Sequence, residues 1–312
     1  MKKILLYSIV PLFGILAGTS CNEDSLSDTS VITNSVNVET EFDSWLEDNY
    51  RAPYNIRFLY RYEDIETNMT YDLVPAKEIY SRILAKMIRF LWIDPYTEAT
   101  DVHFMRENSP RIMQVIGSGA YNTNNTLQLG TAEGGQKITL YVGNWLEDYL
   151  DISYNNGMDE TDGYSVTITD VDNINHYYLH TIHHEFAHIL NQKIDYPTDF
   201  NTISQDDYVA QWNTLTESEA AVLGFVSPYA SSASGEDFVE VFSYYLTWSE
   251  DEWQAKLTQA GTTGANRIER KLAIVKTYME ESWGIDVDQL REILARRYNE
   301  IDLLDWSNFN VE

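Results

Sequence analysis

Residues 175–193 read NHYYLHTIHHEFAHILNQK and contain the pentapeptide His184-Glu185-Phe186-Ala187-His188. The pentapeptide has the pattern H-E-x-x-H, in which two histidines are four residues apart and a glutamate follows the first. On an α-helix, residues four apart lie one turn apart on the same face. The pattern therefore predicts a helix that presents two imidazoles side by side, and the rest of the fold has to be built around it.

The apolar residues of this segment predict that the helix has one dry face. They recur at helical spacing, roughly opposite His184 when about 100° is assigned to each residue. They are Leu179, Ile182, Phe186, Ile189 and Leu190. We expect this stripe to pack inward while His184 and His188 face a cleft. Two imidazoles on successive turns can share one Zn²⁺ at about 2.0–2.1 Å each, and Glu185 can act as general base for an attacking water.

Three further histidines lie close to the motif. His176 and His180 continue the same every-fourth-residue series, but no glutamate follows either of them as Glu185 follows His184. Each step of four residues also drifts about 40° around the helix. We therefore expect His176 and His180 to support the ligands, line the cleft or lie on the surface. His183 points away from this face, and we assign it no role at a metal.

A catalytic zinc usually has three protein ligands and one open position, so a third ligand must come from another segment. In the metzincin pattern a glycine and then a histidine follow the second histidine, three and six residues on. Those positions hold Asn191 and Ile194, so this class is excluded. The remaining candidates are acidic residues downstream of the motif: Glu217, Glu219, Glu236, Asp237 and Glu240.

The segment that begins at Ser234 is predicted to be a helix with two acids on one side. Ser234 is the expected N-cap, and acidic residues follow in the first turn. Glu236 and Glu240 lie one turn apart beside an apolar stripe, and a pair of acids turned inward is costly unless it meets a cation. Zinc would supply that cation. The apolar stripe consists of Phe238, Phe242 and Tyr245.

Residues 228–240 read PYASSASGEDFVE. Together with the motif, this segment resembles the zinc metallopeptidase lipoproteins of Bacteroidetes that are associated with TonB-linked substrate importers. The similarity covers most of the chain after the N-terminal segment and includes residues 45–50 (WLEDNY) and 92–96 (WIDPY). Tyr229 is followed by Glu236 seven residues later and by Glu240 four residues after that. More distantly, this spacing is similar to that in the catalytic domain of anthrax lethal factor.

The resemblance implies a gluzincin arrangement. Glu236 would be the third zinc ligand beside His184 and His188, Glu240 would support the ligands, and Tyr229 would donate its hydroxyl to the reacting carbonyl. The implied fold is a zincin-like α+β domain with a small mixed sheet, the H-E-x-x-H helix, a helical C-terminal part and one Zn²⁺ per chain. From the residues alone, the acids could also be structural and the tyrosine a packing residue. Two acids remain as alternative ligands: Glu217 and Glu219.

The composition excludes several classes of protein. The chain has 312 residues, of which 44% are hydrophobic and 13% aromatic, and this is ample for a core. Its 49 acidic and 21 basic residues give a net charge of −28, which repels phosphate backbones and anionic headgroups, so nucleic-acid binding is excluded as a default. Cys21 is the only cysteine, so any metal must be bound by His, Asp and Glu.

The N-terminal segment is predicted to be a targeting signal. Residues 1–20 combine a short basic start with an apolar run that is too short to span a membrane, and small residues precede Cys21. This resembles a bacterial lipoprotein signal, although Gly18 stands where leucine is more usual; an ordinary secretory signal is the alternative. Residues 21–39 would be a polar, acidic tether. Acids directly after the lipidated cysteine resemble a surface-export signal, and solvated linker charges are an equal alternative.

Residues 40–312 are predicted to form an α+β domain. Strands are expected in an N-terminal part (40–170), whereas a C-terminal part (171–312) is expected to be helical and to carry the zinc site. The predicted strands cover residues 55–62, 112–116, 137–142 and 165–169. The predicted helices outside the site cover residues 41–49, 76–91, 251–259, 268–281 and 288–301.

These features together predict a zinc metallohydrolase that cleaves peptide or protein substrates and is anchored to the outer membrane only by its lipid. The cell-surface side is favoured over the periplasmic side, and a TonB-linked importer is the expected partner. The competing hypothesis is a lipoprotein subunit that captures a ligand for import without turnover. The intact Glu185 argues against it, because a pure binder needs no general base. A third reading, hydrolysis of a non-peptide amide or ester, would use the same site.

Overall fold

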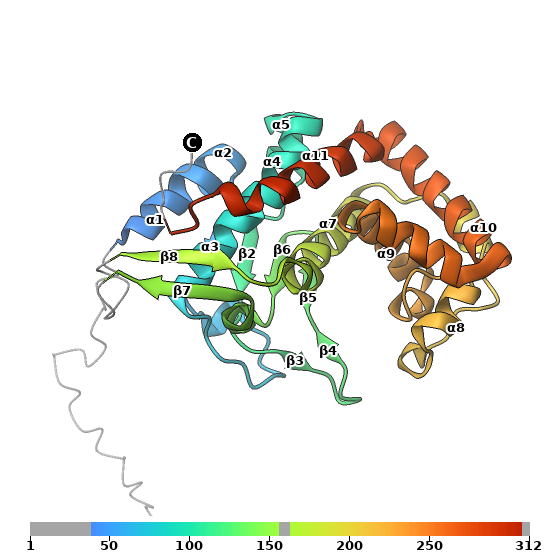
Figure 1. The fold of residues 1–312 in the computed structure, drawn as a ribbon, viewed down its shortest axis with the longest axis horizontal. Helices are drawn as coiled ribbons and strands as arrows, with labels where there is room; N and C mark the ends of the chain where they lie inside the picture. The colour runs from blue at the N-terminus through green and yellow to red at the C-terminus, as the bar shows by residue number, and fades with distance from the viewer. Residues whose placement is uncertain (1–38, 156–162, 308–312) are drawn as a thin grey trace, which may run out of the picture. The chain divides into compact units, whose positions relative to one another are not determined.

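The sheet beside the motif helix has four short strands of mixed orientation (Figure 1). In the computed structural model, which describes residues 39–155 and 163–307, β1 (Arg57–Leu59), β2 (Ile112–Val115) and β6 (Lys137–Leu140) pair in parallel. Strand β5 (Gly130–Glu133) runs antiparallel to β6 and forms one edge of the sheet. The small mixed sheet expected from the sequence is confirmed, and three of its strands lie within predicted ones.

Two further pairs of strands stand apart from this sheet as antiparallel ribbons: β3 (Ala120–Tyr121) with β4 (Leu127–Gln128), and β7 (Leu150–Tyr154) with β8 (Tyr164–Ile168). Only β8 was predicted. The other three strands were not predicted. They have two to five partly exposed residues each, and such strands are stabilised more by pairing with a neighbour than by the propensity of their own residues.

The N-terminal helices are longer than their apolar spacing predicts. The first helix begins at a capping box formed by Thr40 and Asp43, and the second continues well past the predicted end at residue 91. Both pass through a π-helical turn, which a regular 3.6-residue period does not anticipate. The elements, with the 3₁₀ turn η2, are α1 (Glu41–Leu46), η1 (Glu47–Arg51), α2 (Ala52–Tyr54), η2 (Asp64–Glu66), α3 (Glu78–Ile88), η3 (Arg89–Ile93), α4 (Asp94–Ala99) and α5 (Val102–Asn108).

After the 3₁₀ segment η4 (Gly143–Tyr149) and strands β7 and β8, the described chain is helical. Helix α10 consists of two helical segments that meet at a kink at Gly261, which has a φ of 63°, so the prediction of separate helices over 251–259 and 268–281 is confirmed, although both segments are longer than predicted. Glycine adopts this conformation without steric cost. The elements are α6 (Val171–Ile174), η6 (Asn175–Leu179), α7 (His180–Lys193), η7 (Thr198–Thr202), η8 (Trp212–Thr214), α8 (Glu217–Val222), η9 (Tyr229–Ser232), α9 (Ser234–Thr247), α10 (Glu250–Trp283), α11 (Val287–Glu300) and η10 (Ile301–Leu303).

Helix α7 lies in the middle of this arrangement, with β5 and β6 on one side and α9 on another (Figure 1). The five residues of its predicted apolar stripe are all fully buried. Phe186 packs edge-on against Trp92 and Tyr96, with ring centroids 5.2 and 5.1 Å apart. The polar side of α7 is also buried, since His184 and Glu185 are only 6% and 8% exposed. The motif therefore lies inside the protein, where polar groups need partners.

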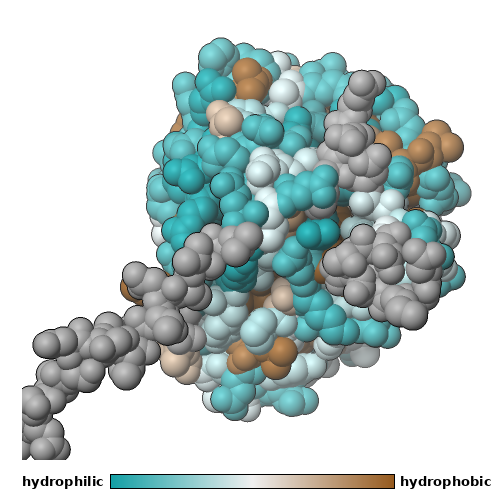
Figure 2. Space-filling view, turned by 90° about the vertical axis from the view of Figure 1, so that its left-hand side faces the viewer, coloured by the Kyte–Doolittle hydropathy of each residue, from teal (hydrophilic) through white to brown (hydrophobic). Residues whose placement is uncertain are grey.

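The surface is consistent with the strongly acidic composition. On the face drawn in Figure 2, hydrophilic side chains predominate and apolar ones occur in small scattered groups. Among the described residues, no helix combines the length and apolar character needed to span a bilayer. The predicted signal (1–20), Cys21 and all of the tether except residue 39 lie outside the described residues.

Candidate active site

The histidines of the motif reach the site because α7 and α9 pack side by side. Helix α6 starts at Asp170, whose side chain accepts a hydrogen bond from the amide of Asn173, and continues through the π-helical turn η6 into α7. Such turns occur often at functional sites. Helix α9 contributes Glu236 from its first turn and Glu240 from its second. The predicted neighbourhood of the two segments is therefore observed.

Three ligand atoms form a nearly equilateral triangle. His184 Nε2 lies 3.2 Å from Glu236 Oε2 and 3.2 Å from His188 Nε2, and His188 Nε2 lies 3.2 Å from Glu236 Oε2. Two ligands bonded to one tetrahedral Zn²⁺ at about 2.0 Å stand about 3.3 Å apart. The triangle has this size, and the His, His, Glu donor set is one that catalytic zinc uses. The residues present therefore fit a zinc ion with one open position.

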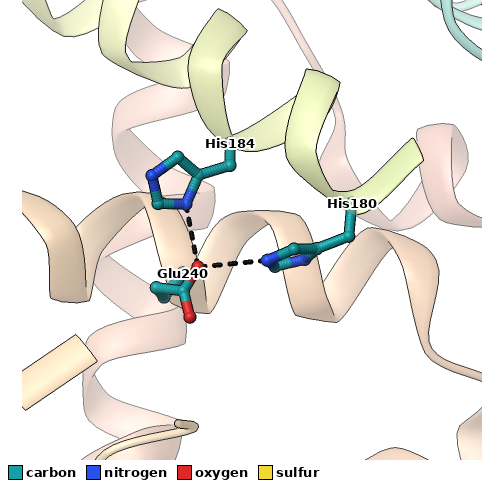
Figure 3. A group of neighbouring side chains, drawn as sticks. All are labelled: His180, His184 and Glu240. Carbon is teal, nitrogen blue, oxygen red and sulfur yellow. Dashed lines mark hydrogen bonds and ion pairs between the residues drawn. The ribbon is translucent and has the colours of Figure 1, made fainter. Parts of the chain in front are cut away.

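Glu240 fixes which nitrogen of His184 faces the triangle. Its Oε1 accepts a hydrogen bond from His184 Nδ1 at 2.8 Å, so in the neutral imidazole Nε2 carries the lone pair. The same oxygen accepts a hydrogen bond from His180 Nε2 at 3.1 Å (Figure 3). Both imidazoles point from α7 at one carboxylate oxygen of α9. His180, His184 and Glu240 could also be grouped around a metal, but their spacing is that of two N–H donors on one acceptor.

The site attracts positive charge. Burial lowers the pKa of His184, but hydrogen bonds to Glu236 and Glu240 outweigh burial and raise this pKa to about 10. Burial raises the pKa of both carboxyls, yet the adjacent histidines lower it well below the usual range. Two ionised carboxylates around one imidazole are the electrostatic setting in which a divalent cation replaces a proton.

Glu185 lies beside the triangle without belonging to it. Burial raises its pKa, while His184 and His188 oppose that increase. The backbone of Ala132 on strand β5 also favours the ionised carboxylate and so opposes the increase in this pKa. Gly130 on the same strand comes so close that a Cβ there would lie 3.3 Å from Glu185 Oε1 and 2.5 Å from Thr181 Cγ2. The edge strand therefore lies in close contact with the side of α7 that carries Thr181 and Glu185.

Tyr229 lies next to the candidate ligand His184 and lines the same cavity. Its ring stands 6.0 Å from that of His184 and 5.0 Å, edge-on, from that of Trp212. Burial, followed by the negative charge of Glu236, raises the pKa of the Tyr229 hydroxyl above its ordinary value. A protonated hydroxyl next to the candidate ligands is able to donate to a substrate oxygen.

A cavity of about 380 Å³ opens beside these groups. It contains Glu185 and Tyr229, two of the extra histidines, aromatic side chains from α9 and η8, and polar side chains from the β3–β4 ribbon. The lining residues that the sequence did not single out are Asn122, Thr126, Leu127, Gln128, Leu129, Gly130, Thr181, Trp212 and Tyr244. None of them carries a signal in its own segment, because they meet only through the tertiary fold.

The other acidic candidates lie away from the triangle. Glu217 is exposed and pairs with Lys256 at 2.8 Å. Glu219 closes the capping box of α8 with Thr216. Asp237 is fully buried but turns to Lys271 at 2.6 Å and to the Tyr208 hydroxyl at 2.8 Å. In the structure these three acids have structural partners rather than a shared metal.

The remaining residues named from the sequence are Ser234 and three further histidines. Ser234 is not the N-cap of α9; the cap is Ala233, and the Ser234 hydroxyl instead accepts a hydrogen bond from Tyr196 at 3.2 Å. His183 is buried in the core, where its Nδ1 lies 3.1 Å from the Tyr96 hydroxyl, and burial lowers its pKa to about 3. His176 and His180 both line the cavity.

Comparison with known proteins identifies the family. A family model described as "Putative zinc-binding metallo-peptidase" matches residues 35–288, which is well over half of the chain. The chain belongs to this family. A crystal structure of a "putative zinc-binding metallo-peptidase" from Bacteroides caccae ATCC 43185 is 42% identical, with a TM-score of 0.69 over 86% of this chain and 95% of that chain. A search of curated proteins found no match.

Membership of the zinc-binding metallo-peptidase family confirms the resemblance inferred from residues 184–188 and 228–240, and with it the α+β fold class. It also supports, at a coarse level, a zinc metallohydrolase. The roles of the individual site residues stay predictions that the observed geometry makes specific.

Proposed function

We propose that this chain is a zinc-dependent peptidase that holds one Zn²⁺ with His184, His188 and Glu236. The observation that carries the proposal is the 3.2 Å triangle of ligand atoms, together with a cavity that Glu185 and the ligand His184 both line. The family match supports the same chemistry. A pure zinc-storage or structural site would need neither an open position nor a buried base.

Each residue has a distinct part in the proposed reaction. When bound, zinc would polarise the substrate carbonyl and acidify the attacking water. Glu185 accepts the proton of this water and passes it to the leaving amine, a task that suits a carboxyl whose pKa is raised by burial. Tyr229 donates a hydrogen bond to the negative charge that develops on the carbonyl oxygen. Glu240 keeps Nε2 of His184 directed at the ligand triangle.

The shape of the site favours an extended peptide as substrate. Strand β5 is an edge of the sheet and lies along α7 next to Glu185. Edge strands present backbone groups to which an extended chain can add. The 380 Å³ cavity beside this edge could take one side chain of such a peptide. Both features support a peptide or protein substrate over a small ester.

The direct test is a cleavage screen with zinc-loaded protein on a broad peptide and protein library. We expect cuts that appear with the wild type and disappear with Glu185→Gln. A wild type that holds zinc and cuts nothing, but binds a nutrient ligand as well as Glu185→Gln does, would instead support the capture subunit.

Removal of the Tyr229 hydroxyl should affect turnover more than binding. Tyr229→Phe is expected to lower kcat by up to about 10²-fold with a smaller change in KM, because the hydroxyl acts on charge that develops in the transition state. Zinc should remain bound, since the hydroxyl is no part of the ligand triangle. Steady-state kinetics with elemental analysis measure both. Tyr196→Phe removes a hydroxyl that donates to Ser234 at the start of α9, and its kcat should stay within about twofold of the wild type.

We also propose that the protein is an outer-membrane lipoprotein at the cell surface, linked to nutrient uptake through a TonB-linked importer. The support is the sequence before residue 40 and the resemblance described above. Replacing Cys21 removes the only residue that the predicted lipoprotein signal can acylate.

Cys21→Ala should therefore move the mature protein from the membrane fraction to the soluble fraction, because the predicted lipid is the sole anchor. Fractionation followed by immunoblotting measures this, and Ser20→Ala, which keeps a small residue before the cysteine, is the control. Unchanged membrane partition of Cys21→Ala would contradict the lipoprotein assignment. Protease accessibility on intact cells then separates the surface side from the periplasmic side.

A further inference from the structure

Glu240 is held by donors on both of its oxygens. Oε1 accepts from His184 and His180, whereas Oε2 accepts from the hydroxyl of Ser227. All four side chains are buried, with Ser227 5% and Glu240 3% exposed. The carboxylate therefore joins two turns of α7 to the loop that precedes η9. An ionised carboxylate with this many donors is fixed in position as well as in charge.

Ser227 is also part of the turn that carries Tyr229. Its Oγ accepts a hydrogen bond from the backbone amide of Ala230 at 3.0 Å while it donates to Glu240. Between these anchor points lie Pro228, whose φ is −56°, and Tyr229 itself. A proline with fixed φ and a side-chain cap leave the backbone of this turn little freedom.

The two halves of the site thus meet at one carboxylate. On one oxygen, Glu240 orients the candidate zinc ligand His184, and on the other it holds, through Ser227, the turn that presents Tyr229. We propose that Ser227 is a positioning residue that couples the placement of the His184 imidazole to that of the Tyr229 hydroxyl. This rests on the proposed function, since Tyr229 matters for turnover only if the site is catalytic.

The coupling predicts two separable effects of Ser227→Ala. Loss of the donor on Oε2 loosens Glu240, so the zinc dissociation constant should rise by up to about tenfold, the low end for groups that orient metal ligands. Loss of the cap lets Tyr229 drift, so kcat should fall by about tenfold with less change in KM. The backbone amide of Ala230 should also exchange its hydrogen faster, because its acceptor is gone.

The decisive experiment is a double-mutant cycle with Tyr229→Phe. In the double variant, kcat should equal that of Tyr229→Phe alone within about twofold, whereas the weaker zinc binding of Ser227→Ala should persist. Losses in kcat that multiply would overturn the proposal, because Ser227 would then act independently of Tyr229. Ser227→Thr, which keeps the hydroxyl, should restore both properties. If the alanine variant does not fold, Ser227→Cys replaces the hydroxyl with a weaker donor and is interpreted in the same way.

Ser231→Ala is the matched control. Ser231 lies in the same turn and its hydroxyl donates to the carbonyl of Pro228 at 2.6 Å, with no part in the Glu240 cluster. It should leave zinc affinity unchanged. An equal loss of zinc affinity in Ser231→Ala would show that the turn as a whole, and not the bond from Ser227 to Glu240, is responsible, and would overturn the proposal.

Failure of the proposed peptidase function can be told apart from failure of this inference. Zinc affinity, measured by chelator competition, and amide exchange at Ala230 need no turnover. Binding of acetohydroxamate to the zinc-loaded protein adds a third readout, since in the proposed site the Tyr229 hydroxyl would donate to its oxygen. Ser227→Ala and Tyr229→Phe should each weaken this binding, and the double variant should bind no worse than the weaker single variant. A wild type without hydrolysis but with this pattern would refute only the peptidase.

Discussion

Glu185→Gln is expected to lower the rate of hydrolysis by about 10²–10⁴-fold, the usual contribution of a general base. The amide keeps the shape of the side chain and still has an oxygen that can accept a hydrogen bond. It cannot accept the proton of the attacking water. Glu185 is not a member of the ligand triangle, so zinc should stay bound at the level of the wild type. The substitution thereby separates chemistry from metal binding.

Single-turnover kinetics on a peptide found in the cleavage screen measure the rate of hydrolysis. Elemental analysis of the same sample measures the bound zinc. Glu217→Gln is the matched control, since it removes the same charge from an exposed glutamate that pairs with Lys256. If Glu185→Gln kept more than about a tenth of wild-type activity, the base would have to be another group, and the proposed assignment of Glu185 would be wrong.

Much of the site could be predicted from the sequence because its elements are local patterns. Histidines four residues apart in an amphipathic segment specify a helix face, and Glu236 and Glu240 lie one turn apart beside an apolar stripe. The two apolar stripes pack against different parts of the core, since Phe186 on α7 contacts Trp92 and Tyr96, whereas Phe238 on α9 contacts Tyr196 and Phe200. Periodicity reveals each stripe separately but not which stripe packs on which.

The rest of the site depends on contacts between distant segments. Ser227 looks like an ordinary cap of a short turn, and its second hydrogen bond, to Glu240, leaves no trace in the neighbouring residues. Strand β5 has four residues beginning with glycine, so its propensity is weak, and its position follows from pairing with β6. The sequence also left three roles open for His180: support of the ligands, lining of the cleft or a place on the surface. Its hydrogen-bond partner Glu240, which decides among them, is 60 residues away in the sequence.

Asp237 shows that the position of an acid in the sequence does not by itself identify it as a ligand. It stands directly after Glu236 and was one of the five acidic residues considered for the third ligand. A shift of one residue turns a helical side chain by about 100°, however, and Asp237 therefore faces α10 instead of α7. There it pairs with the fully buried Lys271. Burial of that lysine could not be foreseen, because its own segment has no feature that distinguishes it from a solvated lysine.

The second large effect is expected from the ligands themselves. His184→Ala, His188→Ala and Glu236→Ala should each reduce zinc from about one ion per chain to near zero, since each removes one of three protein ligands. The structure makes the three equivalent, because every edge of the triangle is 3.2 Å. Dialysis against a weak chelator followed by elemental analysis measures the occupancy, and circular dichroism checks that each variant is folded.

Glu219→Ala supplies the comparison that decides the third ligand. In the structure Glu219 accepts hydrogen bonds from Thr216 at the start of α8, so its removal should weaken the cap of this helix and leave the bound zinc unchanged. Glu240→Ala should have an effect between those of Glu236→Ala and Glu219→Ala, with zinc affinity lowered about 10- to 100-fold. The reason is that Glu240 orients His184 without belonging to the ligand triangle. A chain that loses its zinc with Glu219→Ala and keeps it with Glu236→Ala would refute the ligand triangle, whatever its spacing.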